Sequence, residues 1–334
     1  MKKVFILFFS FVVLIALVAC GDQESSAGGA SEELTEIDIM LDWYPNAVHS
    51  YLYAALENGY FEEEGLKVNI QFPANPTDPI NLAASGQITL GITYQPDVIT
   101  ARANQDVPIK SIGVIVRSPL NHTIFLEDSP LRRPKDLEGK TIGYPGTPVN
   151  QALIKTMVET DGGNPEKVQL IDVGFELGSS LVTGRVDAVT GAYINHEVPV
   201  LKHEGYKTRH FNPVEYGVPS FYQLLFVTSD ETWETQSDII RAFWRGATKG
   251  YDFMVANPDE ALDILLRNQD AANFPLIEEV EKQSLEILFP KMESTDGFGS
   301  QDVNGWQETI DWMKKFGIID VEPSLEDIFV NIVD

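Results

Sequence analysis

Four side chains that can bind a small molecule follow the first expected strand of this 334-residue chain. Asp42, Trp43, Asn46 and His49 lie within the segment LDWYPNAVHSYLY, residues 41–53. Aromatic rings stack on flat molecules, while carboxylates, amides and imidazoles pair with the donors and acceptors along an edge. A simpler interpretation exists for three of them: Asp42 can cap the following helix, Trp43 can cover the sheet edge and His49 can pack in the first helical turn.

Other candidates follow the ends of later strands or lie near residue 222: Tyr94, Gln95, Gly146, Tyr193, Asn195, Glu197 and Tyr222. In parallel α/β sheets the ligand sits beyond the carboxyl ends of the strands, so side chains far apart in the sequence can meet there. Tyr94 and Tyr193 offer rings for stacking, and Asn195 and Glu197 offer polar groups for an edge. Free backbone N–H groups after Gly146 can hold a polar atom. The helix dipole alone also favours a glutamate such as Glu197 at a helix start.

Motifs of common enzyme classes are absent from the sequence. It contains no P-loop, no GxGxxG and no GxSxG segment. The histidines outside residues 41–53 show no HxH or HExxH spacing: His122, His196, His203 and His210. The single cysteine, Cys20, leaves no partner for an intrachain disulfide and no thiolate set for zinc. The sequence therefore predicts no catalytic residues, no cofactor and no metal site.

The N-terminus resembles a lipoprotein export signal. Lys2 and Lys3 precede the apolar run VFILFFSFVVLIALVA, which is short for a membrane span of about 20 residues. The run ends in LVACG, which resembles a lipobox in which the cysteine thiol carries lipid. An ordinary signal peptide or a short anchor that contains a cysteine is the alternative. We expect residues 1–19 to be the signal peptide and residues 20–35 to be a tether lipidated at Cys20.

The charge balance limits the kinds of partner. The chain has 24 basic and 50 acidic residues, and removal of Lys2 and Lys3 with the signal gives 22 − 50 = −28. Repulsion therefore disfavours nucleic acid and anionic lipid as partners. Acidic residues scattered over solvated helix faces explain most of this charge without any function.

Strands alternate with helices over the first part of the folded chain, which is typical of an α/β fold with mostly parallel sheets. The first strand is expected near residues 37–41, where apolar and polar residues alternate, and a helix follows at 48–57. Further strands are expected at residues 67–72, 88–93, 109–116, 123–126, 141–144, 168–173, 187–191 and 224–228. Beyond Asp230 the pattern is helical, with amphipathic segments at 239–255, 258–267, 277–288 and 303–316.

A repeated unit favours two similar lobes. Residues 85–94, SGQITLGITY, and residues 183–193, TGRVDAVTGAY, each combine a glycine after a helix, a buried strand and a tyrosine at the strand's end. Any α/β chain repeats such turns, so this echo alone is also consistent with one domain. Residues 137–146, LEGKTIGYPG, begin a new strand–glycine–helix unit in mid-chain, which supports the two-lobe interpretation.

Several motifs resemble those of a known family: DWYPN with His49, GYFEEEGL at 59–66, GITYQ at 91–95, DLEGK at 136–140 and GAYINHE at 191–197. Over nearly the whole mature chain they resemble the solute-binding proteins of ABC importers, in the branch that binds thiamine-pyrimidine precursors. GYFEEEGL and DLEGK are shared with binders of sulfonates, nitrate and riboflavin precursors. DWYPN and GAYINHE are most similar to the branch whose ligand is N-formyl-4-amino-5-aminomethyl-2-methylpyrimidine, a thiamine-breakdown product.

The resemblance implies a type II periplasmic-binding-protein fold of two α/β lobes joined by two crossing segments. Lobe one would comprise residues 36–126 and 222–334, including the helical C-terminal portion, and lobe two residues 127–221. It also implies a monomeric lipoprotein on the extracytoplasmic face of the cell membrane. Such a protein would deliver a formylated aminopyrimidine to an ABC permease for thiamine salvage.

For this ligand, Trp43, Tyr94 and Tyr193 would stack on the ring, and His49 and Gln95 would serve the formyl amide. Hydroxymethylpyrimidine, a riboflavin precursor or a sulfonate are alternative ligands of the same fold. A sulfonate would require Arg or Lys at the strand ends, which here carry acids and amides. A pyrimidine synthase-like enzyme is the alternative outside transport. In a related eukaryotic branch that makes the pyrimidine, a histidine of the protein is consumed and a cysteine-rich motif is present, and this chain lacks that motif.

Overall fold

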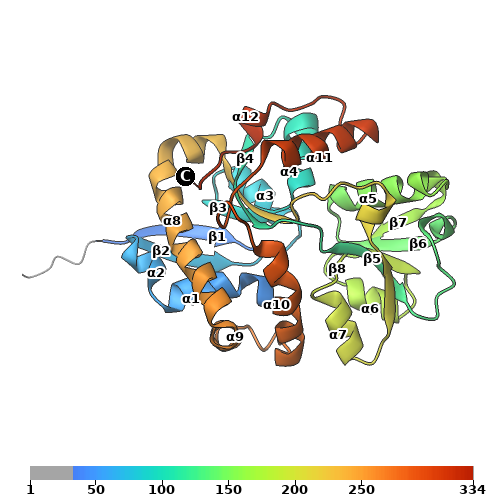
Figure 1. Ribbon diagram of the computed structural model, residues 1–334, viewed down its shortest axis with the longest axis horizontal. Helices are drawn as coiled ribbons and strands as arrows, with labels where there is room; N and C mark the ends of the chain where they lie inside the picture. The colour runs from blue at the N-terminus through green and yellow to red at the C-terminus, as the bar shows by residue number, and fades with distance from the viewer. Residues whose placement is uncertain (1–32, 334) are drawn as a thin grey trace, which may run out of the picture. The chain divides into compact units, whose positions relative to one another are not determined.

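Two five-stranded mixed sheets, each with helices packed against it, make up the part of the chain that the structure describes, residues 33–333 (Figure 1). The structure is a computed structural model. The two sheets confirm the predicted α/β architecture of two lobes. Cys20 and the expected signal peptide lie outside the described residues.

The sheet of lobe one has the strand order β2-β1-β3-β10-β4. Its strands are β1 Thr35–Met40, β2 Leu66–Gln71, β3 Leu90–Thr93, β4 Ile109–Val116 and β10 Leu224–Ser229. β1 pairs in parallel with β2 and β3, whereas β10 is antiparallel to β3 and β4. Four strands therefore point one way and β10 points the other.

The sheet of lobe two repeats this arrangement with the order β7-β6-β8-β5-β9. Its strands are β5 Asn121–Leu126, β6 Thr141–Tyr144, β7 Gln169–Asp172, β8 Ala188–Tyr193 and β9 Thr208–Phe211. β6 pairs in parallel with β7 and β8, and β5 is antiparallel to β8 and β9. The short strand β9 was not predicted from the sequence.

The reversed strand in each sheet is the one that arrives from the other lobe. β4 leads into β5 through residues 117–120, and β9 leads into β10 through residues 212–223. The other strands end at the edge where the lobes meet. A chain that crosses between the lobes therefore enters the next sheet from that edge, and its strand runs antiparallel to the others. The sequence assigned 121–126 to lobe one, but β5 pairs within the second sheet. We therefore propose lobe boundaries within the two crossing segments.

Helices flank both sheets (Figure 1). In lobe one they are α1 Ser50–Glu57, α2 Tyr60–Glu63, α3 Asp78–Ala84, α4 Gln95–Gln105, α8 Asp230–Ala256, α9 Pro258–Arg267, α10 Glu278–Met292, α11 Val303–Lys315 and α12 Leu325–Ile328, with the 3-10 turn η1 Ala47–His49. In lobe two they are α5 Pro148–Thr160, α6 Leu177–Val182 and α7 Glu197–His203. Further 3-10 turns are η2 Pro134–Leu137, η3 Pro165–Lys167 and η4 Pro213–Tyr216. The long helix α8 is interrupted at Gln236, where φ is −133°.

Apolar residues cover both faces of the second sheet. Ile124 and Val189 belong to one apolar cluster, and their neighbours Phe125 and Ala188 belong to another. Successive side chains of a strand point to opposite faces, so each strand contributes to both clusters. A larger cluster fills lobe one between its sheet and α1, α8 and α11.

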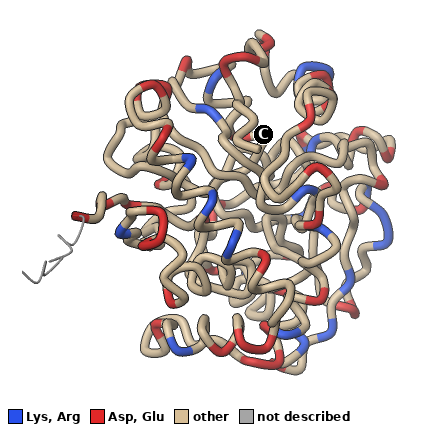
Figure 2. The backbone as a smooth tube through the Cα atoms, turned by 60° about the vertical axis from the view of Figure 1, so that its left-hand side comes forward, with Lys and Arg blue, Asp and Glu red and all other residues tan. Residues whose placement is uncertain are grey.

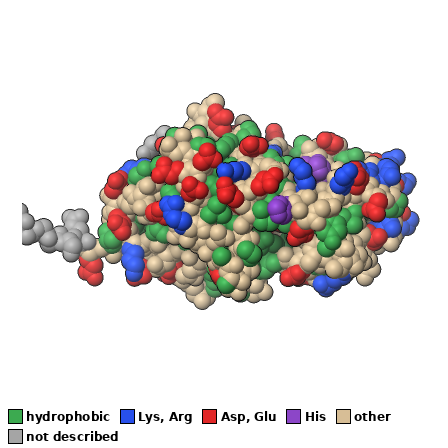
Figure 3. Space-filling view, turned by 90° about the horizontal axis from the view of Figure 1, so that it is seen from below, with side chains coloured by type: hydrophobic (Ala, Val, Ile, Leu, Met, Phe, Trp, Pro, Cys, Tyr) green, Lys and Arg blue, Asp and Glu red, His purple; other side chains and the backbone are tan. Residues whose placement is uncertain are grey.

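Acidic residues are spread over many elements and interspersed with basic ones (Figures 2 and 3). Glu63 and Glu64 belong to an acidic run, residues 62–64. The structure pairs these residues within the chain, since Lys249 contacts both carboxylates and Arg245 contacts Glu64 at 2.7 Å. Exposed pairs of this kind contribute only about 0–1 kcal/mol each. Among the described residues, no helix is both long and apolar enough to cross a membrane.

Candidate functional site

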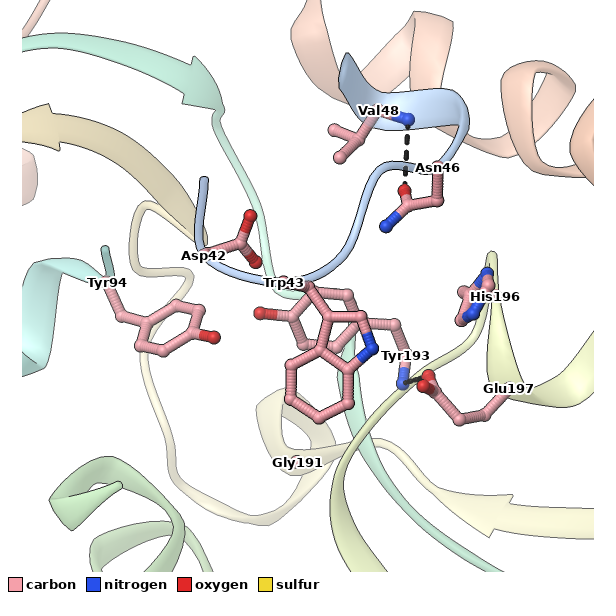
Figure 4. Close-up of a pocket in the computed structure, with 9 residues that line it drawn as sticks. All are labelled: Asp42, Trp43, Asn46, Val48, Tyr94, Gly191, Tyr193, His196 and Glu197. Carbon is pink, nitrogen blue, oxygen red and sulfur yellow. Dashed lines mark hydrogen bonds between the residues drawn. The ribbon is translucent and has the colours of Figure 1, made fainter. Parts of the chain in front are cut away.

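A hollow between the two sheets collects residues from both lobes (Figure 4). It encloses about 360 Å³, part of it open to solvent. Nine residues line it: Asp42, Trp43, Asn46, Val48, Tyr94, Gly191, Tyr193, His196 and Glu197. Six of these are sequence-predicted site residues, so the structure brings together side chains separated by as much as half of the chain.

The segment after β1 is held in place by its own polar groups. The Asn46 side chain accepts a hydrogen bond from Val48 N at 3.2 Å and donates to Tyr44 O at 3.1 Å. The backbone N–H of Ala47 donates to the buried carboxyl of Glu281 on α10 at 2.7 Å. Asn46 thus caps the turn that starts helix α1. This capping fixes the residues before it at the edge of the hollow.

Asp42 is oriented by His49, which lies outside the lining of the hollow. Asn46 N donates to His49 Nδ1 at 3.2 Å, so Nδ1 acts as an acceptor and the ring proton resides on Nε2. His49 Nε2 then donates to Asp42 Oδ1 at 3.0 Å. Both side chains are buried, and the Asp42 carboxylate faces the hollow. We therefore propose that His49 positions Asp42 and, contrary to the expectation from the sequence, does not meet the ligand directly.

Trp43 reaches from lobe one into lobe two. Its indole packs edge-on against Phe175, with ring centroids 4.2 Å apart, and it belongs to an apolar cluster otherwise formed by lobe-two residues. It is 8% exposed, and its Nε1 atom is buried without a hydrogen-bond partner. An unpaired buried N–H group costs about 1–3 kcal/mol. The Trp43 Nε1–H is therefore a buried donor without a partner among the described residues.

Two tyrosines occupy equivalent strand ends in the two lobes. Tyr94 follows β3 and Tyr193 ends β8. Burial raises the pKa of each phenol well above its ordinary value, so both stay neutral. The hydroxyl of Tyr193 accepts from the Gln223 side chain at 3.0 Å. Beside them, the backbone of Gly191 forms part of the wall, where an added Cβ would lie 2.5 Å from Pro145 Cδ.

Glu197 supplies the second carboxylate of the hollow. It is the first residue of α7, and its Oε2 accepts from Tyr193 N at 2.6 Å. Burial raises the pKa of this carboxyl; His196 and the bond from Tyr193 N oppose the shift, and the charge on Asp42 adds to it. Glu197 can therefore hold a proton at higher pH than a solvated glutamate. It can accept a hydrogen bond from an amino group or share a proton with a ring nitrogen.

His196 lines the hollow and joins the lobes. Its Nε2 lies 3.0 Å from the hydroxyl of Tyr44, and its Nδ1 is buried without a partner. Tyr44 in turn stacks on Phe274 with centroids 4.9 Å apart. The spacing of His196 in the sequence argued only against a metal site. Its place next to Glu197 in the GAYINHE motif was the signal that it belongs to the site.

The hollow carries acidic and neutral groups. Among the nine lining residues none is Lys or Arg. Within the described part of the chain, no three His, Cys, Asp or Glu side chains gather closely enough to hold a metal ion. The arrangement can bind a flat, uncharged ring by stacking and can pair carboxylates with donors along its rim. It offers no Lys or Arg as a counter-charge for an anion.

Comparison with known proteins places the chain in a family. The profile of the NMT1/THI5 like family matches residues 46–261. The formylaminopyrimidine-binding protein of Halalkalibacterium halodurans is 53% identical over 323 residues, which cover 96% of this chain and 98% of that protein. The chain belongs to the NMT1/THI5 like family.

Other members and structures of this fold show how widely it is used. A 4-amino-5-hydroxymethyl-2-methylpyrimidine phosphate synthase of Legionella pneumophila is 22% identical over 300 residues, covering 89% of this chain and 92% of that enzyme. The alkanesulfonate-binding protein SsuA from Xanthomonas axonopodis pv. citri, solved bound to MOPS, superimposes with a TM-score of 0.70 at 15% identity, covering 90% of this chain and 99% of that one. This likeness supports the two-lobed binding-protein fold.

Two predicted site residues of this family member support the crossing segment instead of lining the hollow. Gln95 is fully buried; its Oε1 accepts from Tyr222 N at 2.8 Å and its Nε2 donates to Gly305 O at 3.2 Å. The Tyr222 hydroxyl accepts from Asp302 N at 2.9 Å, and its ring packs against Trp306. Both residues therefore hold lobe one to the second crossing, and we propose no direct ligand contact for them.

Gly146 and Asn195 also lie outside the lining. Gly146 has a φ of +80° and forms the turn after β6, with Asp172 Oδ2 only 2.8 Å from where its Cβ would be. The Asn195 side chain is buried and donates to Ser284 on α10 at 2.9 Å, so it joins lobe two to lobe one. Such roles depend on residues distant in sequence, which is why the spacing of the motifs did not reveal them.

Proposed function

We propose that this protein is the substrate-binding lipoprotein of an ABC importer, located on the extracytoplasmic face of the cell membrane. It captures a formylated aminopyrimidine, a product of thiamine breakdown, for thiamine salvage. It performs no chemistry on that ligand, acts as a monomer and delivers it to the permease of the importer. Lipid on Cys20 tethers it to the membrane.

The observation that carries this proposal is the composition of one hollow. Trp43, Tyr94 and Tyr193 supply rings, and Asp42 and Glu197 supply carboxylates at the same place between the lobes. An aminopyrimidine is flat, uncharged and edged with donors and acceptors. Stacking contributes about 0.5–1.5 kcal/mol per ring pair beyond the burial of area. The name of the Halalkalibacterium relative, at 53% identity, supports the same ligand class.

Each polar group has a role in the proposed complex. The Asp42 carboxylate, held by His49, accepts from the exocyclic amino group. The Glu197 carboxyl, with its raised pKa, accepts from an amino group or shares its proton with a ring nitrogen. The free Nε1–H of Trp43 donates to an acceptor such as the formyl oxygen. These groups come from both lobes, so the ligand makes all contacts only when the lobes are close, and its differential affinity favours that state.

Electrostatics disfavours a sulfonate as the alternative ligand. A sulfonate between the Asp42 and Glu197 carboxylates would be repelled, and no Lys or Arg lies among the lining residues to offset that repulsion. A pyrimidine with a hydroxymethyl group in place of the formylated amine meets the same rings and acids. Hydroxymethylpyrimidine is therefore the second candidate, and it would leave the Trp43 N–H less well paired.

Two measurements test the binding proposal. Thermal shift and calorimetry with the formylated aminopyrimidine, hydroxymethylpyrimidine, a riboflavin precursor and a small sulfonate should show the strongest stabilisation by the first. Stabilisation by the sulfonate alone would refute the ligand class. Mass spectrometry of the recovered ligand should show it unchanged, and conversion to a new product would assign the protein to the synthase-like alternative.

A third measurement tests the anchor. Cells expressing the wild-type chain should retain it in the membrane fraction with a fatty acyl label, and Cys20→Ser should remove both the label and the retention. A labelled Cys20→Ser protein would refute lipidation at this residue.

A further inference from the structure

The two lobes are joined by a matching pair of contacts, one on each side of the hollow. Asp97 lies three residues after Tyr94, and His196 lies three residues after Tyr193. Each of them reaches into the other lobe: Asp97 Oδ1 accepts from Val149 N at 3.1 Å, and His196 Nε2 meets the Tyr44 hydroxyl at 3.0 Å. The structural repeat of the two lobes thus places one such side chain three residues after each of the two tyrosines that line the ligand hollow.

The Asp97 carboxylate acts as a helix cap supplied from another lobe. Helix α5 begins at Pro148, and its own N-cap residue, Thr147, makes no capping hydrogen bond to the helix backbone. The Thr147 hydroxyl accepts instead from the Asn150 side chain at 2.6 Å. The first turn of α5 contains no acidic residue. Asp97 on α4 therefore provides the hydrogen-bond acceptor that the first turn of α5 lacks.

Asp97 is buried by both lobes together. Its residue is 7% exposed, and it lies beside a second hollow of about 700 Å³, partly open to solvent, whose lining includes Thr77, Asn81, Thr93 and Pro148. The lining residues from α3, β3, α4 and α5 other than Asp97 itself are uncharged. Asp97 also acts on the Tyr94 phenol: its charge adds to the rise in the pKa of this group, which burial keeps neutral.

We propose that Asp97 is an interlobe latch that caps helix α5 from lobe one and so sets how readily the lobes close around a ligand. The latch rests on the proposed function only for its effect on affinity, because the contact itself joins two residues of this chain. Asp97 is a positioning residue, since it lines a separate hollow from that of Trp43 and Glu197.

The latch makes closure depend on pH. Burial raises the pKa of Asp97 to about 7, and the bond from Val149 N opposes the shift in part. When the lobes separate, the carboxyl meets water and its pKa falls toward the ordinary value of about 4. Protonation therefore favours the closed form. Above pH 7, closure of the lobes must bury an ionised carboxylate, whereas below pH 7 it buries a neutral acid. Affinity should rise as the pH falls from 8.5 to 6.

The first experiment measures the contact directly and needs no ligand. Hydrogen–deuterium exchange of the peptide containing Val149 is followed in the full chain for wild type, Asp97→Ala, Asp97→Asn and the control Asp106→Asn. A cap of about 1 kcal/mol corresponds to about fivefold faster exchange in Asp97→Ala. Asp97→Asn keeps an acceptor and should stay near wild type, as should Asp106→Asn, which removes an exposed acid near the other end of α4. Equal exchange in wild type and Asp97→Ala would refute the latch.

The second experiment measures the affinity for the formylated aminopyrimidine from pH 6 to 8.5. Each unit of pKa difference between open and closed states changes Kd tenfold, so the wild type should tighten at least tenfold more than Asp97→Asn as the pH falls. Glu197 and Glu281 titrate in both proteins and cancel in this comparison. Parallel pH profiles would refute the pH dependence. If wild type binds no pyrimidine at all, the proposed function fails, while the exchange experiment still decides the latch.

Discussion

Replacing Glu197 by Gln should weaken ligand binding and, at the same time, make the free protein more stable. Glu197 Oε2 accepts from Tyr193 N at 2.6 Å, and a glutamine oxygen can keep that bond. The amide N–H group would then stand where the second carboxylate oxygen was, facing a donor on the aminopyrimidine. A hydrogen bond to a charged group contributes about 1.5–3 kcal/mol, so its loss corresponds to about a 10- to 100-fold increase in Kd.

The gain in stability follows from the raised pKa of Glu197. Burial raises this pKa, so the folded chain holds the carboxyl proton at a pH where the unfolded chain has lost it. At low pH the carboxyl is neutral in both states and has no effect. As the pH rises through the folded-state pKa, the folded protein must carry a buried charge and loses stability relative to the Gln variant. The Tm of Glu197→Gln should therefore exceed that of wild type at pH 8, and the difference should shrink toward pH 4.

Calorimetric titration at pH 7.5 and thermal scans from pH 4 to 8 test this reasoning. The matched control is Glu204→Gln, which changes an exposed acid just after the same helix, α7. It should alter neither affinity nor the pH dependence of Tm. Wild-type affinity in Glu197→Gln would remove this carboxylate from the ligand contacts. A Tm below that of wild type at pH 8 would show that the buried charge is compensated and that the assigned cause of the pKa shift is wrong.

Three further changes have defined outcomes. Trp43→Ala should raise Kd at least tenfold, about 1.4 kcal/mol, and Trp43→Phe less, because a ring remains; equal affinities of wild type and Trp43→Ala by calorimetry would exclude stacking. His49→Ala should raise Kd about five- to tenfold, because Asp42 would lose its orientation. The double variant His49→Ala, Asp42→Ala should have the same Kd as Asp42→Ala alone. Additive losses of affinity would mean that His49 contacts the ligand itself. Gly250→Ala should lower the free energy of unfolding by about 1–3 kcal/mol, because its Cβ would lie 2.2 Å from Tyr51 O where α8 crosses α1. Urea denaturation measures this change, and Gly178→Ala is the control, because its Cβ would lie 3.7 Å from Leu201. Equal stability of the two variants would contradict the close packing at Gly250.

Local patterns determined most of the elements. The alternation in β1, the glycine turns before β3 and β8, and the amphipathic segments of α9, α10 and α11 were predicted near their observed bounds. The predicted segment 239–255 missed the first nine residues of α8, which lie before and around the interruption at Gln236. β9 escaped prediction because its four residues, Thr208–Phe211, have no apolar alternation and form a strand only through pairing with β5. The direction of β5 and β10 also needed the tertiary structure, because strand direction depends on which edge of a sheet the chain enters.

The sequence determined which residue types gather at strand ends, and the tertiary structure decided which of them meet. Asp42, Trp43, Asn46, Tyr94, Tyr193 and Glu197 line one hollow because strand ends of both sheets face each other. His49, Gln95 and Tyr222 carry equally suitable groups, but these pair with Asp42, the second crossing and Asp302. Asn195 donates its amide to Ser284, which leaves only its Oδ1 atom unpaired. A hydrogen-bonding group already paired within the protein has little left to offer a ligand, and that pairing depends on contacts between residues far apart in the sequence.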